Sequence, residues 1–300
     1  MLDATFIAMG VHFSTSELEQ LRSVLRSQLD MAFDASPRSE IVIDYESPQG
    51  LHISYQVKAL WATVGEAYDR WARVREAPFF GSEPDARVMA LSAEYPHPST
   101  CRVLDVGAGT GRNALALARR GHPVDAVEMS PRMIALLQGS AQEHSLDQRI
   151  LAMDILKSQE HLHGDYGLVV VSEVTSDFRG VDDLCGLFER VSAHMAPGGR
   201  LLVSIFLARD DYVPDAAAHQ LAQQCYSTFF SRAEIASSSA ESGLILVEDL
   251  SVLDYEREHL PVEAWPPTPW FEEWVTGRDV FDVPREICPI DMRWLVYRKA

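Results

Sequence analysis

Long apolar runs and a cysteine framework are what this 300-residue sequence lacks. No apolar run approaches the roughly 20 residues that a membrane-spanning helix needs. The four cysteines lie far apart and have neither metal-ligand spacing nor the pattern of a disulfide framework, so we expect no metal site and a reducing, cytoplasmic location. The first ten residues have an early acid and no basic segment, which is not the pattern of a signal peptide.

Basic residues are also scarce. The chain has 26 lysines and arginines against 44 aspartates and glutamates, a formal net charge of −18. A nucleic-acid backbone or an anionic membrane requires a basic face, so this balance argues against both as main partners. The 47% of hydrophobic residues is ordinary for a globular protein, and we expect its ligand to be a small molecule.

Glycine is concentrated at one place, in the segment "VLDVGAGTGRN" at 103–113. Gly107, Gly109 and Gly111 follow an apolar run that predicts a buried parallel strand, and "RNALALARR" then predicts a helix. Glycine weakens a strand end, so three of them indicate the close approach of a ligand or of another part of the backbone. The start of a helix also presents free N–H groups to a ligand.

Position 112 separates this loop from a dinucleotide-binding loop. The dinucleotide pattern GxGxxG would place its third glycine there, and this sequence has Arg112 instead. The next predicted strand, 123–128, ends in Glu128, about 20 residues after the first glycine, where an acid binds ribose hydroxyls in such sheets. A nicotinamide-dependent oxidoreductase is therefore an alternative that Arg112 disfavours.

Three segments together, "VLDVGAGTGRN", "AVEMS" (126–130) and "AMDIL" (152–156), resemble the class I S-adenosylmethionine-dependent methyltransferases. The resemblance covers about residues 100–250 and is strongest to the small-molecule branch, which includes tellurite-resistance and thiol-methylating enzymes. It implies an α/β fold with a doubly wound, Rossmann-like sheet of seven strands, the last antiparallel, and S-adenosyl-L-methionine as cofactor.

The resemblance also implies a set of cofactor-binding residues. Glu128 would bind the ribose, Met129 would lie against the adenine, and Asp154 would lie near the adenine amine. The whole set comprises Asp105, Gly107, Ala108, Gly109, Gly111, Arg112, Asn113, Glu128, Met129, Asp154, Ile155 and Ser172.

Each of the three acids has a second interpretation. Asp105 ends an apolar strand, where a carboxylate is costly unless it meets a cationic ligand amine or accepts N–H bonds from its own glycine loop. Glu128 and Asp154 precede predicted helices, where an acid is stabilised without any ligand.

Candidate catalytic residues follow the apolar run 166–178. Glu173 and Asp177 emerge at its polar end, and ligands of open α/β sheets bind outside the carboxyl ends of the strands. Tyr68 is a third candidate, because an N-terminal helix of the resembled family often closes over the cofactor with a tyrosine. A structural role is the alternative for all three. The strand end lacks the signature of enzymes that methylate nucleic-acid amino groups.

The first 75 residues predict an αββα extension. Ser16 and Glu19 fit a capping box at the start of its first helix, and 40–57 predicts a hairpin with its turn at 47–50. A hairpin is not stable alone, so we expect the extension to serve as a substrate lid or as a homodimer contact.

Residues 76–300 are predicted to form the methyltransferase domain, with its last two strands at 244–256 and 292–299. The long stretch 257–291 between them carries Trp265, Trp270, Phe271 and Trp274, which indicates either a ligand wall or packing onto the extension. We expect methyl transfer to a sulfur or nitrogen atom of a small metabolite. A non-catalytic cofactor-binding protein is the other alternative.

Overall fold

The structure is a computed structural model that describes residues 7–8, 12–35, 39–46, 54–60, 63–144, 148–158 and 160–300. The chain divides into two compact units, Met1–Arg70 and Trp71–Ala300. The predicted turn at 47–50 lies outside the described residues.

The first unit contains helix α2 (Thr15–Ala35), strands β1 (Glu40–Tyr45) and β2 (Tyr55–Leu60), and most of α3 (Val64–Arg73). The predicted hairpin is present, since β1 and β2 pair antiparallel. Leu21 of α2 is buried against partly buried apolar residues of both strands. This core is small, which fits the expectation that the hairpin needs further support.

Helix α2 begins two residues earlier than the predicted capping box requires. The Ser14 amide donates to Glu17 Oε2 at 2.7 Å, and the Glu17 amide donates to Ser14 Oγ at 3.3 Å. The box therefore uses Ser14 and Glu17, and the prediction of Ser16 and Glu19 is wrong. Both pairs have the same spacing, so the sequence alone did not distinguish them.

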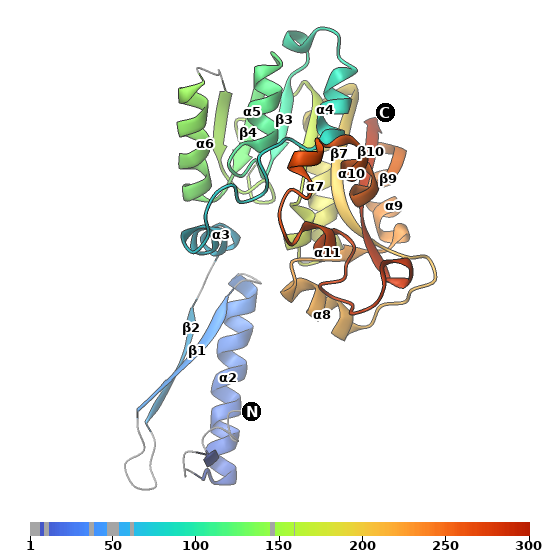
Figure 1. The fold of residues 1–300 in the computed structure, drawn as a ribbon. Helices are drawn as coiled ribbons and strands as arrows, with labels where there is room; N and C mark the ends of the chain where they lie inside the picture. The colour runs from blue at the N-terminus through green and yellow to red at the C-terminus, as the bar shows by residue number, and fades with distance from the viewer. Residues whose placement is uncertain are drawn as a thin grey trace. The chain divides into compact units, whose positions relative to one another are not determined.

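The second unit is built on one large sheet (Figure 1). Its strands are β3 (Val103–Val106), β4 (Val124–Glu128), β5 (Gln148–Ala152), β6 (Tyr166–Val171), β7 (Met195–Ala208), β8 (Phe229–Phe230), β9 (Leu244–Ser251) and β10 (Ile290–Lys299). Among the described residues the order is β5-β4-β3-β6-β7-β10-β9, and β8 pairs with β7. Strand β3 is parallel to β4 and β6, whereas β10 is antiparallel to β7 and β9. The predicted doubly wound sheet with an antiparallel last strand is confirmed, but among the described residues it has eight strands and not the predicted seven, because the two-residue β8 adds to β7.

Helices cover both faces of this sheet. They are α4 (Ala86–Ala93), α5 (Arg112–Arg119), α6 (Pro131–Glu143), α7 (Val181–His194), α8 (Ala216–Gln224), α9 (Arg232–Glu241), α10 (Val252–His259) and α11 (Phe271–Val275), with short 3-10 turns η1 (Pro98–Thr100), η2 (Thr175–Asp177), η3 (Val262–Ala264) and η4 (Arg285–Ile287). One core joins the sheet to α4, α5, α10 and α11, and we call it the first core. The other joins it to α7 and α9, and we call it the second core.

The chain after β9 differs from its prediction. The predicted strand 244–256 ends at Ser251, and Val252–His259 forms α10. The Asp254 amide donates to Ser251 Oγ at 3.3 Å, so Ser251 caps this helix. The apolar residues Val252 and Leu253 are buried in the first core, which a helix achieves as well as a strand.

The aromatic stretch packs within the second unit. Phe271 and Trp274 are buried in the first core, and Trp274 packs edge-on against Phe206 of β7 with ring centroids 5.6 Å apart. Trp274 Nε1 donates to the carbonyl of Tyr226 at 2.8 Å. Packing therefore accounts for these two aromatic residues: Trp274 contacts β7 and the segment after α8, and Phe271 packs edge-on against Trp265.

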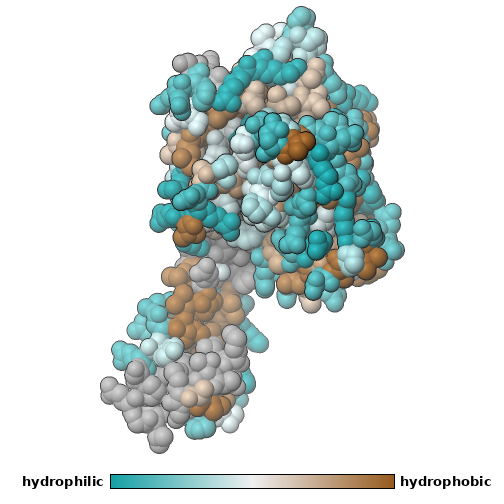
Figure 2. Space-filling model, in the orientation of Figure 1, coloured by the Kyte–Doolittle hydropathy of each residue, from teal (hydrophilic) through white to brown (hydrophobic). Residues whose placement is uncertain are grey.

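The four cysteines are free thiols, and two of them, Cys101 before β3 and Cys288 before β10, are buried. In the described part of the chain, no helix has the length and apolarity of a membrane span. Figure 2 shows hydrophilic residues across most of the visible face of the second unit and brown, hydrophobic residues gathered on the first. Exposed apolar residues of the first unit include Val24, Leu29, Met31 and Leu60.

Candidate cofactor and active site

The glycine loop joins β3 to α5 with a backbone that only glycine adopts readily. The φ angles of Gly107, Gly109 and Gly111 are 71°, 55° and 93°. A Cβ on Gly107 would lie 2.3 Å from Val174 Cγ2, and a Cβ on Gly111 would lie 2.3 Å from Leu137 Cδ1. At Gly109 the nearest atom would be Phe80 Cε2, at 3.6 Å. Gly107 and Gly111 are therefore required by close packing, whereas the space between Gly109 and Phe80 would accommodate a Cβ atom.

Glu128 ties the end of β4 to this loop. Its Oε1 accepts from the amides of Met129 (2.8 Å) and Ser130 (2.7 Å), and its Oε2 accepts from the amide of Gly109 (2.8 Å). The carboxylate thus holds the loop and the start of α6 in place. It lies beside Gly109, so the same side chain is also near the space above the loop.

Asp105 is buried in the floor of the site, with 2% of its surface exposed. Its Oδ2 has no hydrogen-bond partner among the described residues. Burial raises the pKa of Asp105 to about 7, and the charge of Asp85 adds to this, while Arg112 and the Ala114 amide oppose it. A buried carboxyl of this kind is stabilised by the arrival of a cationic group.

Arg112 and Asn113 bind protein groups at the start of α5. Arg112 bonds Asp85 Oδ1 at 2.6 Å and Glu173 Oε1 at 2.8 Å. Asn113 Nδ2 donates to Asp85 Oδ2 at 2.8 Å, and the Asp85 amide donates back to Asn113 Oδ1 at 2.9 Å. Ser172 Oγ donates to the same Asp85 oxygen at 2.7 Å. Asp85 therefore anchors the segment before α4 to the ends of β3 and β6.

Glu173 follows β6 in a left-handed conformation, with φ of 60°. Few non-glycine residues adopt this conformation, and those that do cluster at functional sites. Its amide donates to Ser204 Oγ of β7 at 2.7 Å, and Thr175 Oγ1 donates to the Ser204 carbonyl at 2.9 Å. Burial raises the pKa of Glu173, Arg112 opposes the shift, and Asp85 adds to it.

Helix α4 is capped from far along the sequence. Asp85 occupies its N-cap position without a side-chain cap bond. Instead, Glu256 of α10 accepts from the amides of Ala86 (2.7 Å) and Arg87 (3.2 Å) and from Trp294 Nε1 (2.9 Å). Burial and the charge of Asp85 raise the pKa of Glu256. We call Asp85, Asp105, Glu173 and Glu256, with Arg112 among them, the acid cluster.

The remaining predicted site residues are not part of the acid cluster. Asp154 accepts from the Leu156 amide at 2.9 Å and pairs with Lys157 at 3.2 Å, which is the local structural role. Ile155 is buried and Met129 is exposed. Asp177 lies in η2, just after Glu173, and Tyr68 lies in α3 in the first unit. The catalytic roles of Asp177 and Tyr68 stay predictions.

Sequence reasoning missed the segment that covers the loop. Phe80 stacks on Trp71 with ring centroids 5.3 Å apart and an interplanar angle of 14°. A Cβ on Gly81 would lie 3.0 Å from Pro267 Cβ, so residues 78–85 lie between the glycine loop and the aromatic stretch. The adjacent Phe79 and Phe80 were the available signal, but nothing in the sequence indicated their partners.

Comparison with known proteins identifies the family. A model described as "Methyltransferase domain" matches residues 79–249, more than half of the chain. A ubiquinone biosynthesis O-methyltransferase from Xylella fastidiosa (strain 9a5c) is 33% identical over 175 residues, 53% of this chain and 66% of that protein. A probable S-adenosyl-L-methionine-dependent methyltransferase, TehB, from Haemophilus influenzae (strain 10810) is 27% identical over 113 residues, 38% of each chain.

Solved structures share the fold. Geranyl diphosphate C-methyltransferase from Streptomyces coelicolor A3(2), in complex with Mg²⁺, geranyl diphosphate and S-adenosyl-L-homocysteine, has a TM-score of 0.57 at 16% identity. The match covers 79% of this chain and 98% of that one. The [4+2]-cyclase SpnF has a TM-score of 0.55 at 17% identity over 79% of this chain and 95% of that one. The fold alone therefore does not define the reaction.

The chain belongs to the methyltransferase-domain family, and it shares the fold of S-adenosylmethionine-dependent methyltransferases of known structure. The predicted family, fold and cofactor are confirmed. The acid cluster fits the two cationic groups of S-adenosylmethionine, its sulfonium and its ammonium; the cofactor also carries one carboxylate, but no phosphate. Several buried carboxyls beside the loop favour cations and repel a diphosphate. Among the described residues, no group of three or more His, Cys, Asp or Glu side chains is arranged to hold a metal ion.

Proposed function

We propose that this protein transfers the methyl group of S-adenosylmethionine to a small-molecule acceptor. The acid cluster carries the proposal, since Asp105 and Glu173 lie at the carboxyl ends of β3 and β6 and Arg112 joins Glu173 to Asp85. This is the point of a doubly wound sheet where ligands bind. The unpartnered Oδ2 of Asp105 provides the acceptor that a cationic ligand would meet.

The proposed cofactor contacts follow the predicted residues. The backbone of Gly107–Gly111 lies under the methionine part, Glu128 accepts from the ribose hydroxyls, and Met129, Asp154 and Ile155 surround the adenine. The cofactor supplies an electrophilic methyl group, so the protein's tasks are to bind, to orient and to exclude water. Phe80, above Gly109, contributes to excluding water.

Glu173 is the first candidate for a general base, ahead of Asp177 and Tyr68. Its side chain is only 16% exposed, and desolvation raises its pKa, which suits proton transfer near neutral pH. Arg112 and Ser204 hold its side chain and its amide in place. We predict a sulfur or nitrogen acceptor, but the ubiquinone biosynthesis enzyme named above is an O-methyltransferase, so any acceptor panel should include hydroxyl groups.

A compact acceptor is supported by the elements around the loop. Residues 78–85 meet the aromatic stretch at Pro267, which narrows the space beside Gly109. The net charge of −18 disfavours nucleic acid. The lid or homodimer role of the first unit and the cytoplasmic location remain part of the proposal.

Calorimetric titration with S-adenosylmethionine, S-adenosylhomocysteine and NAD tests the proposal first. We expect both sulfur-containing ligands to bind and NAD to show no saturable binding. Transfer of a labelled methyl group to a panel of thiols, amines and hydroxyl compounds then tests catalysis. Glu173→Gln should lower kcat and leave the affinity for S-adenosylhomocysteine unchanged.

Two outcomes would contradict the proposal in different ways. Tight NAD binding without binding of either sulfur-containing ligand would favour the oxidoreductase alternative. Cofactor binding without turnover across the whole panel would favour the non-catalytic alternative.

A further inference from the structure

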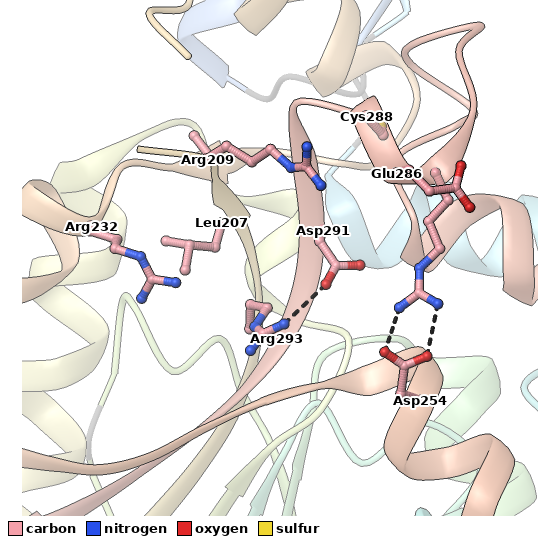
Figure 3. A pocket seen from close by; sticks show the side chains of 10 residues that line it. Leu207, Arg209, Arg232, Asp254, Glu286, Cys288, Asp291 and Arg293 are labelled. Carbon is pink, nitrogen blue, oxygen red and sulfur yellow. Dashed lines mark hydrogen bonds and ion pairs between the residues drawn. The ribbon is translucent and has the colours of Figure 1, made fainter. Parts of the chain in front are cut away.

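A cavity of about 420 Å³ lies where β7 ends and β10 begins (Figure 3). Its volume is in the range of small-molecule sites. Four arginines and three carboxylates line it, together with apolar residues at the end of β7. No residue of the acid cluster is in its lining.

The cavity and the acid cluster use different side chains of β7. Side chains alternate along a strand, and on β7 Phe206 belongs to the first core and Leu207 to the second. Ser204, which bonds the Glu173 amide, shares the face of Phe206. Leu207 and Arg209, which line the cavity, share the other face. Ala208 and Cys288, which also line the cavity, belong to the first core, so the cavity lies at the end of the sheet and shares no lining residue with the acid cluster.

Most charged groups of the cavity wall already have partners. Arg285 makes two bonds to Asp254, at 2.8 and 2.6 Å. Arg293 bonds Asp249 at 2.6 Å and Asp291 at 3.2 Å. Such bidentate and shared pairs fix the side chains in one geometry, so these walls need no ligand to hold them.

Two groups of opposite sign are incompletely paired: Arg209 has no ion pair among the described residues, and Asp291 is bonded to Arg293 through Oδ2 alone. The guanidinium of Arg209 forms no ion pair with any residue that the structure describes, and it extends into the cavity from the end of β7 (Figure 3). Asp291, at the start of β10, has a buried Oδ1 without a hydrogen-bond partner in the described residues. Burial raises the pKa of Asp291, as expected for a carboxyl whose charge is poorly compensated.

We propose that this cavity binds a small zwitterion that carries a carboxylate and an ammonium. The planar guanidinium of Arg209 matches a carboxylate, and Asp291 Oδ1 supplies an acceptor for the ammonium. A simple anion would leave the buried oxygen unpaired, and a simple cation would leave the exposed Arg209 bonded to water alone. A ligand with both groups satisfies both residues, and this inference does not depend on the proposed methyl transfer.

The test is calorimetry on the full chain with straight-chain amino acids from glycine to 6-aminohexanoate. Each amino acid is compared with the carboxylic acid and the amine of the same length. At least one amino acid should bind at least tenfold more tightly than both of its matched compounds. Arg209→Gln and Asp291→Asn should each weaken that binding at least tenfold.

Arg298→Gln is the matched control, because Arg298 is exposed at the other end of β10 and lies outside the cavity. This variant should bind the amino acid as the unchanged protein does. Titration with S-adenosylhomocysteine checks that each variant retains its fold. Equally tight binding of a matched acid or amine would overturn the assignment, and so would the absence of saturable binding by every amino acid of the series.

Discussion

Asp105 links the electrostatics of the site to the stability of the protein. Its pKa of about 7 in the folded chain lies well above the value of about 3.9 for an unfolded chain. Between these values the folded protein binds more protons, so the contribution of Asp105 to stability falls as the pH rises through this window. Asp105→Asn should therefore stabilise the unliganded protein more at pH 8 than at pH 5.5, as measured by thermal unfolding.

Cofactor binding should reverse this effect, because a cation beside Asp105 favours its ionised form. Saturating S-adenosylmethionine should raise the unfolding temperature more at pH 8 than at pH 5.5. In Asp105→Asn the rise should be the same at both pH values. An identical pH dependence in the two proteins would place the cation elsewhere.

Glu128 combines a structural and a proposed binding role, and a substitution separates them. Glu128→Ala should weaken binding of S-adenosylhomocysteine by about 1.5–3 kcal/mol, as expected for hydrogen bonds to a charged group. Glu234→Ala is the control, since Glu234 Oε2 also accepts a backbone N–H, that of Ser231 at 2.7 Å, but in α9. The control should lose stability and keep its cofactor affinity. Unchanged affinity in Glu128→Ala would leave only the structural role.

At the residue scale, the sequence identified groups that follow a strand end and missed their distant partners. Asp105, Glu128 and Glu173 could be predicted because a parallel sheet brings strand ends together. Glu256 could not, because it lies 170 residues from the Ala86 amide that it accepts from. No local pattern specifies such a contact.

The glycine loop is the element whose substitutions distinguish packing from binding. Gly111→Ala should destabilise the fold strongly, because its Cβ would overlap Leu137, whereas Gly109→Ala has space. Both substitutions carry the cost of positive φ, about 1–2 kcal/mol. In Gly109→Ala the loss of stability should be modest, and because the added methyl group would occupy space proposed for the cofactor, the affinity for the cofactor should fall as well. Urea unfolding and titration with S-adenosylhomocysteine measure the two quantities, and equal stability losses would contradict the packing difference.

Among the elements, those with strong local signals were predictable. The box at Ser231 and Glu234 starts α9 as its sequence pattern indicates, and the buried strands follow their apolar runs. Helix α10 was predicted as part of a strand, because its buried apolar residues fit both periods. The pattern of Ser251 and Asp254 was the signal for a helix start there.

The division of the chain into two units leads to a prediction about the whole molecule. All the cofactor-site contacts described above lie within Trp71–Ala300, so a chain of residues 64–300, which keeps α3 whole, should bind S-adenosylhomocysteine with unchanged affinity. Its methyl transfer should fall, because the first unit is the proposed lid or dimer contact. Calorimetry, activity and solution scattering measure this. A monomeric and fully active truncated chain would remove both proposed roles.

The rate at which the buried thiols are chemically modified should report how often the fold opens. Cys101 is 5% exposed with a pKa raised to about 11 by burial, and Cys288 is 2% exposed. Because the thiolate is the reactive form, alkylating reagents should modify both residues only after the fold opens. A ligand that binds only the folded form reduces the fraction of open protein by a factor of 1 + [L]/Kd. At a ligand concentration of a hundred times Kd, alkylation should therefore be about a hundredfold slower. This protection applies equally to a ligand at the glycine loop and to one in the β7–β10 cavity.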